Sequence, residues 1–189
     1  TRGVPGTHDT KLLYNSLTKL KRKNFKPFSI PQFDKSKDNR CDKNHWLQIK
    51  KKPDIIIFEG WCVGAKSQSK NSLISPINEL ERKQDKNLIW RKKVNLELKG
   101  NYKKIFDLIT LLIFLKVPSF KYVYMWRVLQ EKKLRTSSKG NKIMNNFQIK
   151  KFIMFYERIT RDMLKTLPKK SKVLISIDKS HCLHSMKVK

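Results

Sequence analysis

Hydrophobic residues follow strand-like runs in some parts of the chain and helical spacing in others. Three compact runs predict strands: 55–58, 108–115 and 172–178. Apolar residues at helical spacing predict helices between and around these runs, and the ranges are about 10–23, 95–107, 119–134 and 146–167. Asp9 precedes the first helix as an N-cap. Between the predicted elements lie a short edge strand at 28–33, a polar loop at 34–44 and a polar surface insertion at 67–93.

The order of these elements predicts an α/β fold with a doubly wound, mostly parallel sheet. The run Ile55–Phe58 lies between Pro53 and Gly60, and its continuous apolar character is typical of a strand buried on both faces. We expect one domain over residues 1–189, with a lid-like helical region at about 118–145. In such sheets ligands bind beyond the carboxyl ends of the strands. This rule points to Glu59, to the segment after Leu115 and to the residues after Asp178.

The charge of the chain is its most unusual property. The formal net charge is +29, which favours a nucleic-acid binder because clustered cations neutralise phosphates. Only nine of the 44 basic residues are arginine, and the lysines are scattered along the whole chain. Nucleic-acid readers favour arginine for bidentate contacts. Compositional drift on solvent-facing positions therefore competes with the nucleic-acid interpretation, and we expect nucleic acid not to be the main partner.

Cysteines and apolar runs bear on the compartment. Cys41, Cys62 and Cys182 form no CxxC pair and no zinc-binding pattern, which suggests reduced thiols in a cytoplasmic protein. The opening residues show no signal-peptide pattern, so we expect no targeting segment. The run 108–115 is far shorter than the roughly 20 residues of a membrane span, so we expect a soluble protein. His181 and His184 flank Cys182, but a frayed tail explains this segment better than a metal site.

Glu59 and Gly60 end the first predicted strand, in the manner of a Walker B element. Phosphoryl transfer requires an acid at this place to hold the Mg²⁺ shell or to orient the nucleophile. Gly60 lets the backbone turn sharply beside a ligand. A strand that ends in an ordinary solvated glutamate fits the same residues.

Three polar clusters are further candidates. Arg2 to Asp9 places a guanidinium, an imidazole (His8) and a carboxylate around a Gly-Pro-Gly turn, which suits an anionic, hydroxylated small molecule. The loop from Lys35 to Arg40 supplies two cations. Arg127 and Glu131 share a helix face at i, i+4, and Arg135 lies two turns further on. The alternatives are a capped helix, a solvated loop and a surface salt bridge, respectively.

Five motifs in a fixed order resemble the D-glycerate 3-kinase family, within the phosphoribulokinase/uridine-kinase branch of P-loop kinases. The motifs are Arg2-Gly3-x-Pro5-Gly6-Thr7-His8-Asp9, Phe33-Asp34-Lys35-Ser36, Ile57-Phe58-Glu59-Gly60-Trp61-x-x-Gly64, Asn95, and Tyr122-Val123-Tyr124-x-Trp126-Arg127-x-x-Gln130-Glu131. The resemblance implies a P-loop kinase-type fold and an enzyme that uses ATP and Mg²⁺ to phosphorylate a hydroxyl of D-glycerate or a similar metabolite.

The resemblance also implies roles for individual residues. Residues near the phosphoryl acceptor would be Arg2, His8 and Asp9 (the last also catalytic), with Lys35 and Arg40 near substrate or phosphates. Glu59 would be the Walker B acid that reaches Mg²⁺ through water, and Arg127 would be the catalytic lid arginine. The residues on the nucleotide side would be Gly60, Arg127, Arg135 and Asp178.

The sequence also departs from this family. It contains neither the first strand with its GxxGxGK[ST] phosphate loop nor the acidic Asp-Asp-Phe-Tyr segment, so we expect the 189 residues alone to be nearly inactive. The family's Gly-Asp-Arg is Asp38-Asn39-Arg40 here. A kinase for a nucleoside or another acceptor, a decayed kinase retained as an interaction module, and a non-catalytic basic nucleic-acid-binding domain remain as alternatives. The oligomeric state is open.

Overall fold

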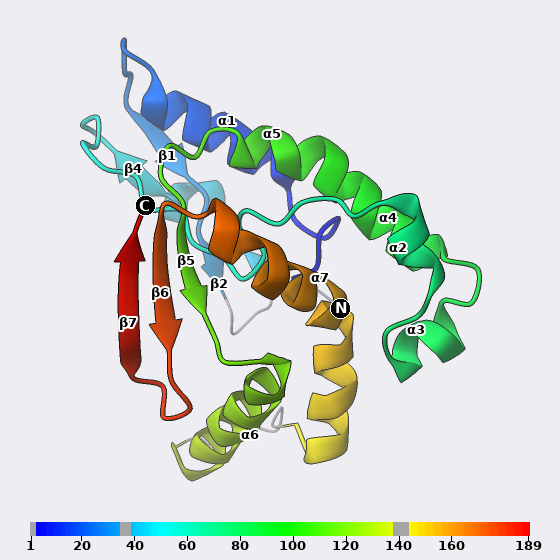
Figure 1. Ribbon diagram of the computed structural model, residues 1–189. Helices are drawn as coiled ribbons and strands as arrows, with labels where there is room; N and C mark the ends of the chain where they lie inside the picture. The colour runs from blue at the N-terminus through cyan, green and yellow to red at the C-terminus, as the bar shows by residue number, and fades with distance from the viewer. Residues whose placement is uncertain (1–2, 35–38, 138–143) are drawn as a thin grey trace. The chain divides into compact units, whose positions relative to one another are not determined.

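The computed structural model describes residues 3–34, 39–137 and 144–189 (Figure 1). The chain divides into two compact units, Asp9–Glu59 and Thr1–His8 with Gly60–Lys189. The single domain expected over 1–189 stays a prediction. Of the residues described, no helix is both long enough and apolar enough to cross a membrane.

The unit Asp9–Glu59 begins with helix α1 (Thr10–Lys21), as predicted. The Asp9 side chain accepts a hydrogen bond from the backbone N–H of Leu12 (3.0 Å), which satisfies an otherwise unpaired donor in the first turn. Short antiparallel pairs follow, joined by the 3-10 turn η1 (Lys43–His45). The pairs are β1 (Phe28–Ile30) with β4 (Leu47–Ile49), and β2 (Phe33–Asp34) with β3 (Asn39–Arg40).

The predicted buried strand Ile55–Phe58 is wrong for this structure. The segment has no strand assignment, and Ile55 and Ile57 are 79% and 87% exposed. A continuous apolar run becomes a buried strand only when strands pair with both of its edges and helices cover its faces. None of the described strands pairs with it.

The larger unit contains one three-stranded sheet in the order β5–β6–β7 (Figure 1). Strands β5 (Ile113–Lys116) and β6 (Val173–Ile177) are parallel, and β7 (Leu183–Val188) pairs antiparallel with β6. The mixed α/β class is confirmed. Among the described residues, however, parallel pairing is limited to β5 and β6, and the tail expected to fray is strand β7.

The core of the larger unit is built on helix α7 (Asn146–Lys170), which extends the predicted helix by three residues. Ile159, Met163 and Leu167 pack against Phe114 of β5 in one apolar cluster. Ile149 and Ile153, one to two turns earlier, pack against Phe120 of helix α6 (Phe120–Ser137) in a second cluster. The 3.6-residue period therefore places the sheet and α6 along one stripe of α7.

Residues 67–93, expected to be a surface insertion, instead contain a buried ionic cluster. The segment carries helices α2 (Lys70–Ile74) and α3 (Glu79–Gln84) and leads into α4 (Ile89–Glu97), the π-helical turn η2 (Leu98–Tyr102) and α5 (Lys103–Phe106). The side chain of Arg91 is 3% exposed, and its Nε donates to Asp85 Oδ2 (2.9 Å). Arg158 of α7 binds Glu81 at 2.6 Å. This cluster fastens α3 and α4 to α7.

We expect Arg91→Leu to destabilise the fold by about 3–5 kcal/mol, because it leaves Asp85 as an unpaired buried charge. Burial alone would raise the pKa of Asp85, but hydrogen bonds from Arg91 and from the backbone N–H of Trp90 outweigh it and lower that pKa. A lowered pKa in the folded state contributes stability above the ordinary aspartate pKa of about 3.9, and this contribution is lost as pH falls below it.

Urea unfolding at several pH values measures both effects. The matched control is Lys83→Ala, which removes an exposed ion pair with Glu79 and should change the unfolding midpoint little. Equal effects of the two substitutions would contradict the structural role of the buried cluster.

Candidate functional site

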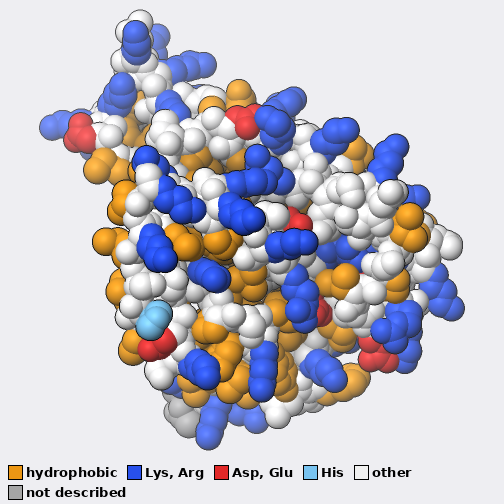
Figure 2. Space-filling model, viewed as in Figure 1, with side chains coloured by type: hydrophobic (Ala, Val, Ile, Leu, Met, Phe, Trp, Pro, Cys, Tyr) orange, Lys and Arg blue, Asp and Glu red, His pale blue; other side chains and the backbone are white. Residues whose placement is uncertain are grey.

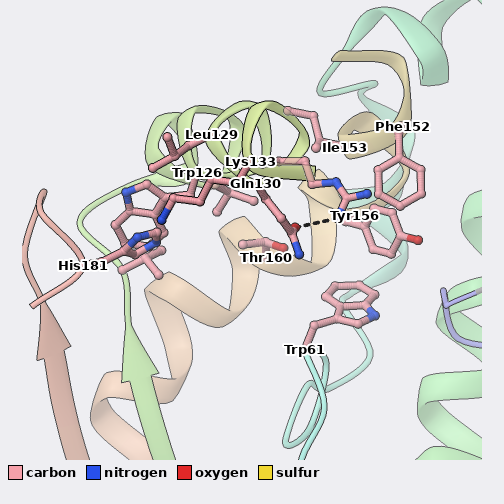
Figure 3. Close-up of a pocket in the computed structure, with 13 residues that line it drawn as sticks. Trp61, Trp126, Leu129, Gln130, Lys133, Phe152, Ile153, Tyr156, Thr160 and His181 are labelled. Atoms are coloured by element: carbon pink, nitrogen blue, oxygen red, sulfur yellow. Dashed lines mark hydrogen bonds between the residues drawn. The ribbon is translucent and has the colours of Figure 1, made fainter. Parts of the chain in front are cut away.

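An apolar concavity with converging polar groups lies between α6, α7 and the turn after β6 (Figure 3). Its volume is about 700 Å³, within the range of small-molecule sites. Its aromatic wall consists of Trp61, Trp126, Phe152 and Tyr156, and its polar groups include Arg127, Gln130, Lys133 and His181. This α6–α7 pocket therefore combines stacking surfaces with cations.

Arg127 is held in this pocket by its own helix. Its Nη2 donates to Glu131 Oε1 (2.5 Å), and its Nη1 donates to Gln130 Oε1 (2.6 Å). The side chain of Glu131 is only 4% exposed and also accepts from the backbone N–H of Met144 (3.1 Å). The guanidinium lies over the Phe152 ring, 5.5 Å from its centroid. The Met144 N–H thus helps to hold the carboxylate of Glu131, and this carboxylate holds the guanidinium of Arg127.

One group of Arg127 remains unused. Its Nε–H is buried and has no hydrogen-bond partner among the described residues. Buried donors are normally paired, so an orphaned one needs an explanation. Beside a pocket of this size, an anionic oxygen of a ligand would supply the missing acceptor.

Trp126 and His181 form a tilted ring pair at one end of the pocket, with an interplanar angle of 41° (Figure 3). Their ring centroids are 3.7 Å apart, and Trp126 Nε1–H donates to the Lys179 carbonyl (3.4 Å). His181 has φ +67°, a left-handed conformation that is uncommon for a non-glycine residue and is often found at functional positions. Asp178 holds this turn, because its Oδ1 accepts from the N–H groups of Ser180 and Cys182.

The loop before α1 is anchored within the larger unit. Val4 and Pro5 are buried, and Trp61 Nε1–H donates to the Gly3 carbonyl (2.6 Å). His8 Nδ1 lies 2.5 Å from the hydroxyl of Tyr102. Residues 1–2 lie outside the described residues, so the structure does not place Arg2.

In the other unit, an ion pair joins Asp9 and Arg40. Arg40 Nη2 donates to Asp9 Oδ2 at 3.0 Å, and both side chains are nearly half exposed. The hydrogen bond from the Leu12 N–H lowers the pKa of Asp9, burial opposes this effect, and Arg40 lowers the pKa further. Lys35 lies outside the described residues.

The other predicted site residues have simpler surroundings. Glu59 and Gly60 are exposed. Arg135 is exposed and donates to the Met144 carbonyl (3.1 Å), outside the residues that line the α6–α7 pocket. Among the described residues no group of three or more His, Cys, Asp or Glu side chains gathers in a way that could hold a metal ion.

Sequence reasoning missed Tyr102, Lys133 and His181. Nothing in the local pattern distinguished Tyr102 from a core aromatic residue, since its role depends on a contact 94 residues away. His181 was placed in a frayed tail because strand β7 was not predicted. Lys133 was one lysine among many on an exposed helix, although its spacing of six from Arg127 was visible.

Three kinases, from two yeasts and a plant, are similar in sequence to this chain. The uncharacterized kinase mug58 of Schizosaccharomyces pombe is 33% identical over 162 residues, which are 82% of this chain and 56% of that protein. The chloroplastic D-glycerate 3-kinase of Arabidopsis thaliana is 26% identical over 173 residues, or 88% of this chain and 35% of that protein. The probable ATP-dependent kinase TDA10 of Saccharomyces cerevisiae is 31% identical over 170 residues, or 82% and 53%. No protein-family model matches the chain.

Two solved structures share the fold over the whole chain. The D-glycerate 3-kinase from Cryptococcus neoformans var. grubii superposes with a TM-score of 0.75 at 22% identity, and this chain covers 69% of it. The YGR205w protein superposes with a TM-score of 0.73 at 26% identity, with 66% of its chain covered. The chain spans about half the length, or less, of the curated relatives it matches. The resemblance to D-glycerate 3-kinases and related kinases is thus confirmed, in sequence and in fold, for the part of those proteins that the chain spans.

Proposed function

We propose that the chain is the acceptor-binding and lid part of an ATP-dependent kinase that phosphorylates a hydroxyl of D-glycerate or a similar metabolite. The observation that carries this proposal is the held but incompletely paired Arg127 in the α6–α7 pocket. An arginine fixed by a buried acid offers its remaining donor to an anion without reorganising. Kinase relatives across more than 80% of the chain support the same assignment.

The described residues fit a nucleotide. The aromatic rings of Trp126 and His181 offer faces for a planar base, and Arg127 and Lys133 suit phosphate oxygens. ATP supplies the transferable phosphoryl group. Arg127 would bind its oxygens, orient them towards the acceptor and offset the charge that develops during transfer. Asp178 would act indirectly, by holding the turn that carries His181.

The described residues offer fewer groups to Mg²⁺ than to the nucleotide, but they do not oppose its binding. The exposed carboxylate of Glu59 is available, and Mg²⁺ commonly takes one or two carboxylates together with phosphate oxygens and water. Gly60 would allow the backbone to approach the phosphates. On the acceptor side, Arg2, His8, Asp9, Lys35 and Arg40 would bind the carboxylate and orient the hydroxyl.

The positive charge does not need a nucleic-acid role. Figure 2 shows Lys and Arg side chains spread over the visible face, interspersed with apolar and neutral groups, rather than gathered in one stripe. A protein that reads nucleic acid concentrates its cations along the path of the phosphate backbone. A scattered excess of positive charge instead attracts small anions such as ATP and glycerate from all sides.

The decisive experiment is an assay of the protein encoded by the complete gene, including any codons upstream of Thr1, with ATP, Mg²⁺ and D-glycerate. We expect ADP and a phosphoglycerate, detected by coupled assay and by ³¹P NMR. The 189 residues alone, which contain no GxxxxGK[ST] loop, should turn over very little ATP. Turnover with a nucleoside but not with D-glycerate would show that the proposed acceptor is wrong and that the proposed kinase activity is right. No phosphoryl transfer to any hydroxyl acceptor would reject the whole proposal.

Removing the lid arginine tests the α6–α7 pocket itself. We expect Arg127→Met to weaken ATP binding about tenfold or more, since a charge-assisted hydrogen bond is worth roughly 1.5–3 kcal/mol. Quenching of tryptophan fluorescence reports binding, because Trp61 and Trp126 line the pocket. Lys132→Met removes an exposed cation from the same helix and should leave affinity within about twofold, as surface charges are largely screened. Equal losses in both variants would contradict a specific role for Arg127.

Asp9 can be tested for catalysis separately from capping. Asparagine caps helices as well as aspartate, whereas alanine costs about 1 kcal/mol. We therefore expect Asp9→Asn to keep the thermal midpoint and Asp9→Ala to lower it. In the full-length enzyme both substitutions should reduce kcat by about a hundredfold or more, as loss of a catalytic carboxylate does. An active Asp9→Asn enzyme would leave Asp9 with its capping role alone.

A further inference from the structure

We infer that Tyr102 is a positioning residue for the acceptor site, and that its hydroxyl fixes His8 in one tautomer and orientation. The inference rests on the proposed function for its catalytic meaning, but its structural content can be tested separately. Tyr102 and His8 are 94 residues apart, and both belong to the larger unit.

Tyr102 is presented by an irregular turn of helix. The π-helical turn Leu98–Tyr102 interrupts the helical run between α4 and α5. Single π-turns are rare and occur frequently at functional sites, because the wider turn re-aims the side chains that follow. Tyr102 is 4% exposed. Its ring makes edge contacts with both Phe106 and His8, so the position of its hydroxyl is fixed by packing.

The hydroxyl meets backbone N–H groups of Gly6 and His8, whose hydrogen bonds lower the pKa of Tyr102, and the ring nitrogen Nδ1 of His8. The backbone N–H of Gly6 donates to it (3.1 Å), and His8 Nδ1 lies 2.5 Å away. Gly6 has φ +98°, and a Cβ at this position would lie 3.2 Å from the Glu97 side chain. The loop can bring its N–H to Tyr102 because residue 6 is glycine.

The loop that carries His8 is fastened at its other end as well. Gly3 N–H donates to the Thr7 hydroxyl (2.9 Å), which donates to the Val4 carbonyl (2.7 Å). Trp61 holds the Gly3 carbonyl. Bonds within the loop thus hold Thr7, and Tyr102 adds a contact from outside the loop beside His8.

Counting protons gives the tautomer. Burial raises the pKa of Tyr102, against the opposing effect of the Gly6 hydrogen bond, so the phenol is protonated at neutral pH. The backbone N–H groups of Gly6 and His8 can only donate, which leaves Nδ1 of His8 as the described acceptor for the hydroxyl proton. Neutral His8 then carries its own proton on Nε2. In the reverse arrangement Nδ1–H would donate and the buried phenol proton would have no described partner.

The tautomer can be read by NMR of the ¹⁵N-labelled 189-residue chain, through two-bond ¹H–¹⁵N couplings of the His8 ring. At a pH where His8 is neutral, we expect the Nε2–H form in the wild type and a mixture of tautomers in Tyr102→Phe, which keeps the ring. Tyr124→Phe, on helix α6, should leave the His8 signals unchanged. An Nδ1–H form in the wild type, or an unchanged His8 in Tyr102→Phe with native amide shifts elsewhere, would overturn the inference.

The full-length enzyme supplies the functional readout. We expect Tyr102→Phe to raise the KM for the acceptor about tenfold, the size of one lost hydrogen bond to a positioned group, while the KM for ATP stays within about twofold. An equal rise in both would indicate a general structural effect and overturn the positioning role. If the wild-type enzyme phosphorylates no acceptor, the proposed function fails, and the NMR result still decides whether Tyr102 fixes His8.

Discussion

The packing of one stripe of helix α7 is the constraint on which the larger unit depends. Ile149, Ile153, Ile159, Met163 and Leu167 are buried along this stripe at intervals of four to six residues. Full burial of such side chains contributes about 1.5–3 kcal/mol each. No other helix contacts both α6 and the sheet through apolar clusters among the described residues. The two clusters therefore share one rigid element.

The α6–α7 pocket inherits its geometry from that stripe. Phe152, Tyr156 and Thr160 lie on α7 beside the buried positions, and they face Gln130 on α6 (Figure 3). The guanidinium of Arg127 lies over the Phe152 ring. Any ligand in the pocket is therefore bound by residues whose backbones are fixed by the core. The turn that carries His181 is less supported by apolar packing, and Asp178 replaces packing with two hydrogen bonds. Rigid helices thus form the walls, and a hydrogen-bonded turn closes one end.

Periodicity predicted the elements that depend on a single amphipathic face. Helices α1, α6 and α7 and strand β6 lie where the apolar spacing placed them. The prediction failed at Ile55–Phe58, because an apolar run shows that a segment tends to be buried but not what will cover it. It also failed at β7, whose alternating polar residues pair with β6 mainly through backbone hydrogen bonds. The start of a strand was also wrongly predicted: the predicted strand was 108–115, but only 113–116 pairs with β6.

The candidate site was predictable to the extent that its residues lie in local motifs. Arg127 and Glu131 share a helix face, and Asp9 caps a helix, so their spacing was informative. Tyr102 and the buried Arg91 cluster were not predictable, since both depend on contacts between distant segments. A polar segment such as 67–93 reads as surface when each charge is considered alone. Such a segment can be buried when its opposite charges pair with one another.

Arginine and lysine have different roles in this chain: arginine pairs with the buried acids, and lysine supplies most of the surplus positive charge. The buried acids Glu81, Asp85, Glu131 and Glu157 all pair with arginine. Guanidinium is more weakly hydrated than ammonium and offers donors in a planar fork, so it is cheaper to bury and better matched to a carboxylate. These four acids are a minority of the 15 acidic residues in the chain. The net charge of +29 follows from 44 basic and 15 acidic residues, and Figure 2 shows the cations spread over the visible face. The same field would draw anionic substrates towards a site in which arginine, and not lysine, is already held in place.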